Sequence, residues 1–366
     1  MVDWDYYRSI FPVTHNQAYF MTAGAGPIPT PVLDAISDRY KKLSIHGGEI
    51  FQANLEMVER CRQEVAKLIN AESEDIAFIP NVSFGMNALS SALPVQTNLI
   101  IPADEFPSSI IPWRKAGHEI NLIPFSPDLQ SNIRTALTST VSLVTSYVQY
   151  SSGYRINLDE LGHNKKNDDA MFAVNGTQAI GVFPLDVKQS KIDVLLCACH
   201  KWMFCGEGIA FLYINPKFFK KLNPSIIGWR SSPYAMQMSI YESRLYESAR
   251  VFEIGWSNMT IFAGFEKSLE IISTIGIKNI TARITTLMDR LVVGLKNYAI
   301  PTISIDNTQH RSGIILLGPF DNLDSLLLKL REHNILVTKR GNGVRVAIHF
   351  YNNEADIDHL LHVLRS

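Results

Sequence analysis

The sequence predicts an α/β protein whose mostly parallel sheet is followed by a smaller α+β lobe. From about residue 55 to residue 215, short apolar runs rich in β-branched residues alternate with segments of helical length. From about residue 258, long helical patterns take over. At 366 residues and 46% hydrophobic content, the chain is large enough for a substantial core in two lobes. Such a sheet is covered on both faces and binds ligands at the carboxyl ends of its strands.

In chain order, the first lobe opens with an amphipathic helix over residues 55–70, because its apolar residues recur at helical spacing. Buried strands are expected at the apolar runs 76–79, 98–101, 119–123, 141–145, 170–174, 192–196 and 209–214. The second lobe should contain helices at 258–275, 279–298, 322–333 and 354–364, and strands at 302–305, 313–317, 336–339 and 344–349. We expect a large domain over residues 15–257 and a small C-terminal domain over residues 258–366, with residues 1–14 packed on the small one.

Composition and charge argue against several classes of protein. The formal net charge of −1 gives no electrostatic reason to expect nucleic acid or an anionic membrane as a partner. The first residues lack the apolar stretch of a signal peptide, and no apolar run is long enough to span a bilayer. The four cysteines, Cys61, Cys197, Cys199 and Cys205, do not form a zinc-binding pattern. We therefore expect a cytoplasmic protein with reduced cysteines and without a metal site.

Lys201 is the residue whose surroundings point to chemistry. It follows the predicted strand 192–196 and His200, and Gly206 and Gly208 separate it from the next predicted strand. A lysine held between two buried strands is poorly placed for a solvated charge. It is well placed for a desolvated amine that forms a Schiff base with an aldehyde cofactor.

Four motifs occur in an order and spacing that resemble the class V aminotransferase family of enzymes dependent on pyridoxal 5′-phosphate (PLP): Gln178, His200-Lys201, Arg345 and Tyr351-Asn352. This family includes cysteine desulfurases and isopenicillin-N-epimerase-like proteins, and the resemblance extends over nearly the whole chain. It implies the type I fold of PLP-dependent transferases, the aspartate aminotransferase type, with a seven-stranded sheet in the large domain. It also implies PLP as cofactor and Lys201 as the catalytic lysine.

The resemblance assigns several cofactor contacts. Val82, Ser83 and the amide of Phe84 correspond to the family's phosphate-binding turn. From the residues alone, this turn is simply a helix start with Ser83 as its N-cap. Phe106 takes the place of the residue that stacks on the pyridine ring, with a core phenylalanine as the other interpretation. His200 is assigned to the phosphate, with a structural histidine as the alternative.

Three further positions match or depart from the family pattern. Gln178 matches the residue that hydrogen-bonds the phenolic oxygen of the cofactor. Asn175 stands where the family has the Asp that keeps the pyridine nitrogen protonated, and a neutral amide cannot raise the pKa of that nitrogen as a carboxylate does. Trp256 occupies the place of a Thr that contacts the phosphate in the neighbouring subunit, so the resemblance also implies a homodimer.

Arg345 lies in an apolar strand, which favours a specific partner over a surface salt bridge, and the resemblance assigns it to the substrate α-carboxylate. We therefore expect a PLP-dependent enzyme that acts at the α-carbon of a small amino acid, with transamination as its activity. The alternatives are a lyase or epimerase of the same family, or a weakly catalytic PLP-binding relative because of Asn175. No cysteine occurs between Cys205 and Ser366, so a cysteine desulfurase is not expected.

Overall fold

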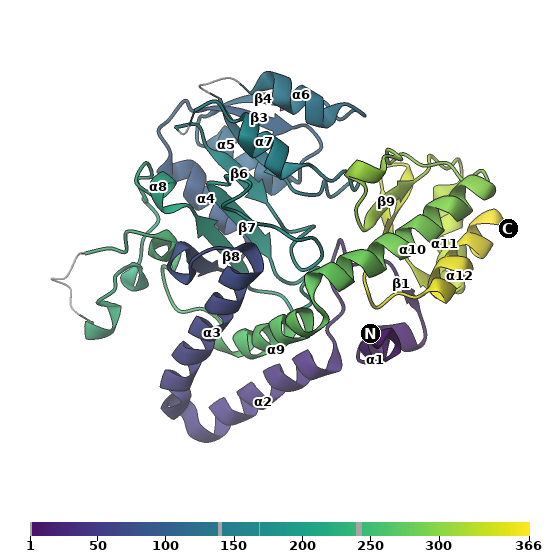
Figure 1. Cartoon of the computed structure of the whole chain (residues 1–366). Helices are drawn as coiled ribbons and strands as arrows, with labels where there is room; N and C mark the ends of the chain where they lie inside the picture. The colour runs from purple at the N-terminus through teal and green to yellow at the C-terminus, as the bar shows by residue number, and fades with distance from the viewer. Residues whose placement is uncertain (1, 138–140, 168, 239–243) are drawn as a thin grey trace.

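A computed structural model of the chain describes residues 2–137, 141–167, 169–238 and 244–366. The chain forms a larger lobe around a central sheet and a smaller lobe that contains the C-terminus (Figure 1). The helices of the larger lobe are α2 (Thr30–His46), α3 (Phe51–Ile69), α4 (Val82–Ala92), α5 (Ile111–Lys115), α6 (Leu129–Ala136), α7 (Leu158–Asn164), α8 (Pro216–Phe219) and α9 (Met259–Ile275). Beside the smaller lobe lie α1 (Trp4–Ser9), α10 (Ile277–Asn297), α11 (Leu323–Glu332) and α12 (Glu354–Arg365).

The central sheet has seven strands in the order β2-β8-β7-β6-β5-β3-β4. Its strands are β2 (Ile76–Ile79), β3 (Asn98–Pro102), β4 (Glu119–Ile123), β5 (Ser142–Ser146), β6 (Phe172–Asn175), β7 (Val194–Ala198) and β8 (Ala210–Ile214). All neighbours are parallel except β8, which runs antiparallel to both β2 and β7. The predicted α/β class and seven-stranded, mostly parallel sheet are therefore confirmed.

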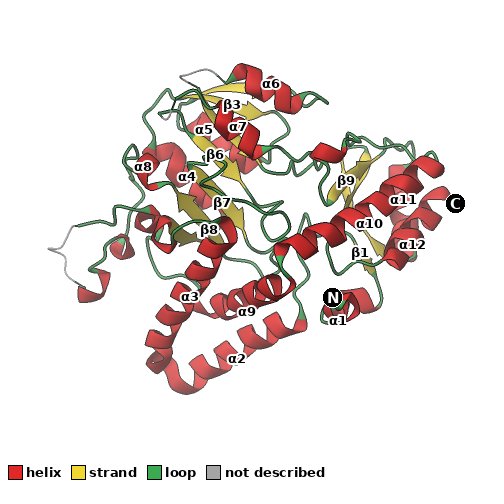
Figure 2. Cartoon of the chain, viewed as in Figure 1, coloured by secondary structure: helices red, strands yellow, loops and turns green. Residues whose placement is uncertain are grey.

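Helices cover both faces of this sheet, as the near-continuous burial of its strands requires (Figure 2). In β6, Phe172 and Val174 point into the core shared with α3, α6, α7 and α9. Ala173, on the opposite face, belongs to the core shared with α4 and α5. The alternation of the two faces follows from the period of two in a strand. Polar side chains are left for the strand ends, where a site can form.

The smaller lobe is built on a three-stranded antiparallel sheet in the order β11-β12-β9. Its strands are β9 (Ile314–Leu317), β11 (Thr338–Arg340) and β12 (Gly343–Ala347), and the short β1 (Ala18–Tyr19) pairs separately with β10 (Ile335–Leu336). Val344 and Val346 pack into a core with α10, α11 and α12. The outward-facing residues of β11 and β12 on the other side of this sheet are then available to the space between the lobes.

Two predicted strands of the smaller lobe are corrected. Residues 302–305 do not form a strand, because the amides of Ile303 and Ser304 both donate to the carbonyl oxygen of Leu316 instead of alternating along a ladder. Only an isolated bridge joins Thr302 to Leu317. The predicted strand 336–339 is divided into β10 and β11, which pair with different partners.

The N-terminal helix α1 is bonded to the C-terminal part of the chain beside the smaller lobe. Arg8 donates to the Asp356 carboxylate and to the carbonyl oxygen of Tyr351, with each Nη1 distance at 2.7 Å. In Figure 1, α9 lies beside α2 and α3, and α10 continues toward the smaller lobe. The boundary between residues 257 and 258 falls just before α9 and stays a prediction. Within the described ranges, no helix has the length and apolar character needed to cross a membrane.

Candidate active site

A cavity of about 290 Å³ lies at the carboxyl ends of β5, β6 and β7 and reaches the hairpin of β11 and β12. The structure brings most of the predicted site residues together here. Those that line it are Val82, Ser83, Phe106, Asn175, Gln178, His200, Lys201 and Arg345. Phe84 and Trp256 are not among the residues that line it.

Lys201 stands in the turn between β7 and β8, which reverse direction as an antiparallel pair. Its Nζ lies 5.6 Å from the centroid of the Phe106 ring. Within the described part of the chain, this amine makes no hydrogen bond or ion pair. Burial, and then repulsion from Arg345 and Arg340, lower the pKa of Lys201 to about 8. A substantial fraction of the amine is therefore neutral, and thus nucleophilic, near neutral pH.

The lysine turn is fixed by the N-terminal segment. Gly26 donates its amide to the carbonyl oxygen of His200 at 2.9 Å. A Cβ at Gly26 would lie 2.0 Å from the carbonyl oxygen of Lys201, so only glycine permits this approach. His200 is half-buried, and burial followed by the charge of Lys201 lowers its pKa. His200 is thus held neutral beside the cavity at physiological pH.

Gln178 is tied to the chain on both sides of its amide. Its Nε2 donates to the carbonyl oxygen of Ala23 at 3.0 Å, and its Oε1 accepts from the indole of Trp202 at 2.7 Å. One N–H of this amide remains for a bound group. This agrees with the implied donor role toward a phenolic oxygen, and the contact itself stays a prediction.

Asn175 ends β6 and is buried. Its Nδ2 donates to the hydroxyl of Ser109 at 3.3 Å, and its Oδ1 accepts the amide of Thr177 at 3.1 Å. The side chain is therefore oriented by two partners on the cavity wall. It carries no charge, so any positive charge on a bound ring must be balanced elsewhere.

The start of α4 lies at one end of the cavity, and the expected cap is corrected. Asn81, not Ser83, is the N-cap, because its side chain accepts the amide of Phe84 at 2.8 Å. Ser83 is the second residue of the helix and lines the cavity. The Phe84 amide is already paired, so the helix end offers an anion the hydroxyl of Ser83 and the remaining first-turn amides.

Arg345 enters from β12, opposite Thr338 of β11. It is buried, and its Nη1 donates to the carbonyl oxygen of Tyr150 at 2.8 Å. Its Nε and Nη2 have no partner among the described residues. Burial, and then the charge of Arg340, lower the pKa of Arg345 to about 10, so the group stays charged at neutral pH. Two donors of a buried guanidinium are thus left for an anion from outside the chain.

Arg340 is a site residue that the sequence did not reveal. It lies two residues beyond Thr338, and because that residue faces Arg345 across the hairpin, Arg340 and Arg345 project from the same face. Arg340 also lines the cavity, its guanidinium lies 5.8 Å from the Tyr150 ring centroid, and its Nε has no partner among the described residues. The signal was present in the hairpin register, which cannot be read before the strands are paired.

The charges around this cavity are unbalanced. Lys201, His200, Arg340 and Arg345 line it, and no aspartate or glutamate is among its lining residues in the described ranges. An aldehyde that also carries a phosphate would meet a partly neutral amine, a helix N-terminus and unpaired guanidinium donors. The residues present therefore fit PLP, although Asn175 withholds the carboxylate expected near its ring.

Trp256 lies outside the cavity. Its ring stacks on Phe51 at 4.9 Å and 4°, and on Trp229 at 5.9 Å and 20°. The Arg230 guanidinium lies 4.8 Å from its centroid, and 45% of the residue is exposed. Trp256 does not line the cavity of its own chain. Its assigned contact with the cofactor of a neighbouring subunit therefore remains a prediction.

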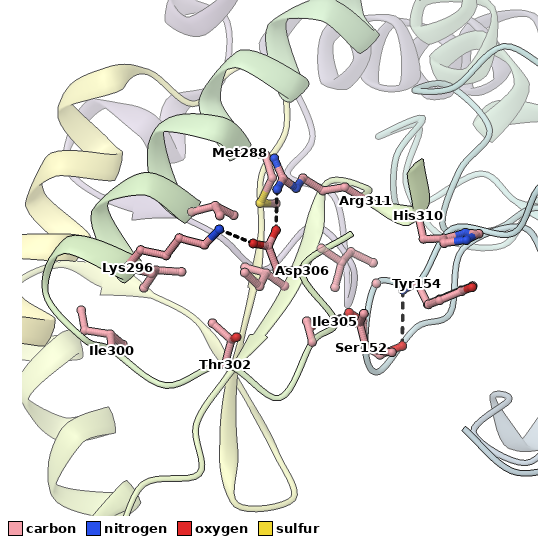
Figure 3. Close-up of a pocket in the computed structure, with 16 residues that line it drawn as sticks. Ser152, Tyr154, Met288, Lys296, Ile300, Thr302, Ile305, Asp306, His310 and Arg311 are labelled. Carbon is pink, nitrogen blue, oxygen red and sulfur yellow. Dashed lines mark hydrogen bonds and ion pairs between the residues drawn. The ribbon is translucent and has the colours of Figure 1, made fainter. Parts of the chain in front are cut away.

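A second cavity, of about 80 Å³, lies between α10, residues 302–306 and the loop 152–154 (Figure 3). Figure 3 shows Lys296 and Arg311 directed at Asp306, with N–O distances of 2.5 Å in both ion pairs. Arg311 also pairs with Asp289. Because its charged groups are paired with one another, this cavity has little need of an ionic ligand, and we do not assign it as the active site.

The Aminotransferase class-V family model matches residues 18–360 of the chain. A "Probable cysteine desulfurase" of Pyrococcus abyssi is 26% identical over 386 residues, covering 98% of this chain and 96% of that protein. The "Uncharacterized aminotransferase YcbU" of Bacillus subtilis is 22% identical over 97% of this chain and 95% of its own. A solved structure of the cystine C–S lyase C-DES with its product cysteine persulfide has a TM-score of 0.89 at 22% identity, covering 97% of this chain and 99% of that one.

These comparisons correct the functional expectation. The sequence predicted transamination and excluded a cysteine desulfurase, and that exclusion is wrong, because relatives with that name match over 98% of the chain. The exclusion rested on a missing cysteine after Cys205. A cysteine determines which group accepts the sulfur. It does not determine whether a C–S bond can be broken, which requires an electron sink, a base and a bound carboxylate.

Proposed function

The chain belongs to the class-V aminotransferase family, and we propose that it cleaves the C–S bond of cysteine or of its disulfide, cystine. The observation that carries the proposal is the cavity with a partly neutral Lys201 and two guanidinium groups that have free donors. The names of the relatives support sulfur-containing amino acids as the substrate class. The cofactor is PLP, which when bound to the substrate nitrogen withdraws electrons from the α-carbon.

Lys201 is the proposed acid–base group. Its amine would hold PLP covalently, and it would be free to act as an acid or base once the substrate is bound. With a pKa of about 8, the freed amine can accept the α-proton near neutral pH. The electrons of the broken C–H bond then expel sulfur from the β-carbon as a thiolate or persulfide anion. Hydrolysis of the remaining three-carbon fragment gives pyruvate and ammonia.

Arg345 is the proposed anchor for the α-carboxylate. Its free Nε and Nη2 form a fork that matches two carboxylate oxygens. Because Nη1 is held by the Tyr150 carbonyl, the guanidinium is oriented before the substrate arrives. Such an anchor orients the α-C–H bond of the substrate toward the amine of Lys201. This orientation increases the rate of proton removal.

Cystine is the better supported of the two substrates. No cysteine is among the residues described around the cavity, and the four cysteines of the chain are buried, so the protein offers no thiol there to accept sulfur. With cystine, the departing sulfur stays on the second half of the substrate, which leaves as cysteine persulfide. Cystine also carries a second carboxylate, and Arg340 projects from the same face as Arg345 to meet it.

The test is a product assay on the PLP-loaded protein with cystine and with cysteine, the latter in the presence and absence of an added thiol. We expect pyruvate and ammonia in equal amounts from cystine, with persulfide trapped by an alkylating reagent. Cysteine should give pyruvate, ammonia and sulfide without an added thiol; an added thiol that attacks the substrate sulfur should instead give a persulfide and alanine. If amino-group transfer to an added α-keto acid occurs and no persulfide forms from either substrate, the proposal is wrong.

We further propose that the protein acts as a homodimer. Large apolar side chains are exposed on α2, including Ile45 at 75% and Leu33 at 51%, and Trp256 is 45% exposed. The stacked rings of Phe51, Trp256 and Trp229 continue this apolar surface. Sedimentation equilibrium of the PLP-loaded protein should give twice the chain mass, and Leu33→Asp should shift it toward the monomer. A monomer at micromolar concentration would contradict this proposal.

A further inference from the structure

Glu105 is a buried carboxyl group that no step above uses. It follows β3, directly before Phe106, and is 4% exposed. Its Oε2 accepts the hydroxyl of Ser146 at 2.6 Å, and its Oε1 accepts the Ser146 amide and the Nε2 of Gln149, the latter at 2.8 Å. Every partner of the carboxyl group is a donor, which is the arrangement that stabilises the ionised form.

This carboxylate has no cation partner in the described ranges. No ion pair includes Glu105, and the neighbouring Asp104 adds repulsion. Burial raises the pKa of Glu105 to about 7, against the effect of its three donors. A buried negative charge without a counter-ion is costly, so the position requires either protonation or a positive charge supplied by a bound group.

The sheet places this charge beside the position where the family carboxylate is missing. Ser146 ends β5 and is the register partner of Asn175 at the end of β6. Register partners on adjacent strands lie about 4.8 Å apart and project to the same face. Both residues line the cavity, so one hydroxyl group separates the Glu105 carboxylate from the wall that Asn175 occupies.

We propose that Glu105 is a positioning residue that supplies, through the Ser146 hydroxyl, the negative charge that Asn175 lacks, and so favours a protonated cofactor ring nitrogen. The cation that a buried Glu105 requires is then the ring N–H⁺ of bound PLP. The other titratable groups around the cavity are basic: the positive charges of Lys201, Arg340 and Arg345 oppose such protonation, and His200 is neutral. The proposal depends on PLP and on the predicted orientation of Asn175 toward its ring, and it is independent of which sulfur amino acid reacts.

The test measures protonation directly. Wild-type protein and variants are loaded with PLP labelled with ¹⁵N in the ring, and the ¹⁵N chemical shift is followed by NMR between pH 5 and pH 10. In Glu105→Gln, which keeps the shape of the side chain, the midpoint for loss of the ring proton should fall by about one pH unit or more. Asn175→Asp in the Glu105→Gln background should restore it, because a carboxylate again faces the ring.

Two further variants separate this role from a structural one. Ser146→Ala keeps the carboxylate and removes the intervening hydroxyl, so it should also lower the midpoint. Asp104→Asn is the matched control, because it neutralises the adjacent half-buried carboxyl, which bonds to Ser151 and not to Ser146. A midpoint that is unchanged in both Glu105→Gln and Ser146→Ala, whatever happens to thermal stability, would overturn the proposal. An equal shift in Asp104→Asn would also overturn the proposal. Any nearby negative charge would then affect the ring nitrogen equally, without a specific path through Ser146.

Discussion

The cavity around Asp306 and the cavity around Lys201 differ in how their charges are satisfied. Around Asp306 the cations Lys296 and Arg311 are paired with carboxylates from the chain itself. Around Lys201 the cations have no carboxylate partner among the described residues, and a buried carboxylate, Glu105, lies behind the wall with no cation partner in the same part of the chain. The first arrangement is complete without a ligand. The second is complete only when a group with both an anionic and a cationic part is bound.

The comparison shows that unpaired charged groups identify the active site better than the shape of a cavity does. The Lys201 cavity concentrates groups whose pKa values are displaced by burial and by like charges, which is typical of reactive centres. The free energy that these displaced groups cost the empty protein is returned when cofactor and substrate bind. Charge changes should therefore affect catalysis at one cavity and only stability at the other.

The largest effect is expected for Lys201→Ala. Without the amine, the protein loses both the covalent attachment of PLP and the base, so the rate of C–S cleavage should fall by roughly 10²- to 10⁴-fold or more. Borohydride reduction and peptide mapping should label Lys201 in the wild type and no lysine in the variant. Lys188→Ala, which removes an exposed lysine paired with Glu72, is the control. Label on another lysine in the wild type would disprove the assignment.

A smaller loss is expected for Arg345→Gln, which removes the fork and leaves the substrate carboxylate without its partner. The apparent affinity for cystine should fall by about 2–5 kcal/mol, or roughly 30- to 4,000-fold. Cofactor affinity, measured by titration of the cofactor-free protein, should change much less. Arg290→Gln, which loses an exposed ion pair with Asp358, serves as control. Unchanged substrate affinity in Arg345→Gln would remove this residue from the site.

The next prediction concerns the pH dependence of cofactor attachment. Only the neutral amine of Lys201 attacks the aldehyde, so the attachment rate should rise with pH and level off above about 8, the lowered pKa of this group. Removing a like charge with Arg340→Gln should raise the pKa and move the profile to higher pH. Stopped-flow absorbance on cofactor-free protein provides the measurement. A half-maximum near the pKa of a free lysine would contradict the burial of the amine.

The smallest effect is expected at the cavity around Asp306, whose charged groups are paired with one another. Asp306→Asn breaks the ion pairs with Lys296 and Arg311, which are partly exposed, so the free energy of unfolding should fall by only about 0.5–1 kcal/mol. Denaturant titration measures this loss. The rate of cystine cleavage should stay within the error of the assay. A large loss of activity would mean that the two cavities are coupled and that the comparison is misleading.

Most of the central sheet could be predicted because its strands are short, apolar and separated by helix-length segments. The predicted strands 76–79 and 119–123 coincide with β2 and β4, and the others of this sheet agree within two residues. Helix α2 was not expected, since Val32 is its only buried residue and an exposed helix leaves no apolar period in the sequence. Its stability depends on packing against α9, a contact between segments that are more than 200 residues apart.

The site could be predicted only as far as its motifs are local. Lys201, Asn175 and Gln178 are close in sequence, and they meet as neighbouring strand ends. The sequence around Arg340 and around Glu105 contains no motif that marks either residue as part of the site. Each reaches the site only because of the way its strand is paired with a neighbouring strand. Arg340 depends on how β11 pairs with β12, and Glu105 on how the end of β3 meets the end of β5. Pairing of this kind cannot be read from one sequence.

The N-terminal segment that crosses the lysine turn has a consequence for the order of events during synthesis. Gly26 bonds to His200, and Met21 forms a bridge to Ala347 beside Arg345. The cavity therefore joins the beginning, the middle and the end of the chain. A chain still on the ribosome can form the central sheet, but it lacks the wall that β12 provides. The cavity is therefore complete only after β12 has been synthesised and has folded against the end of the central sheet.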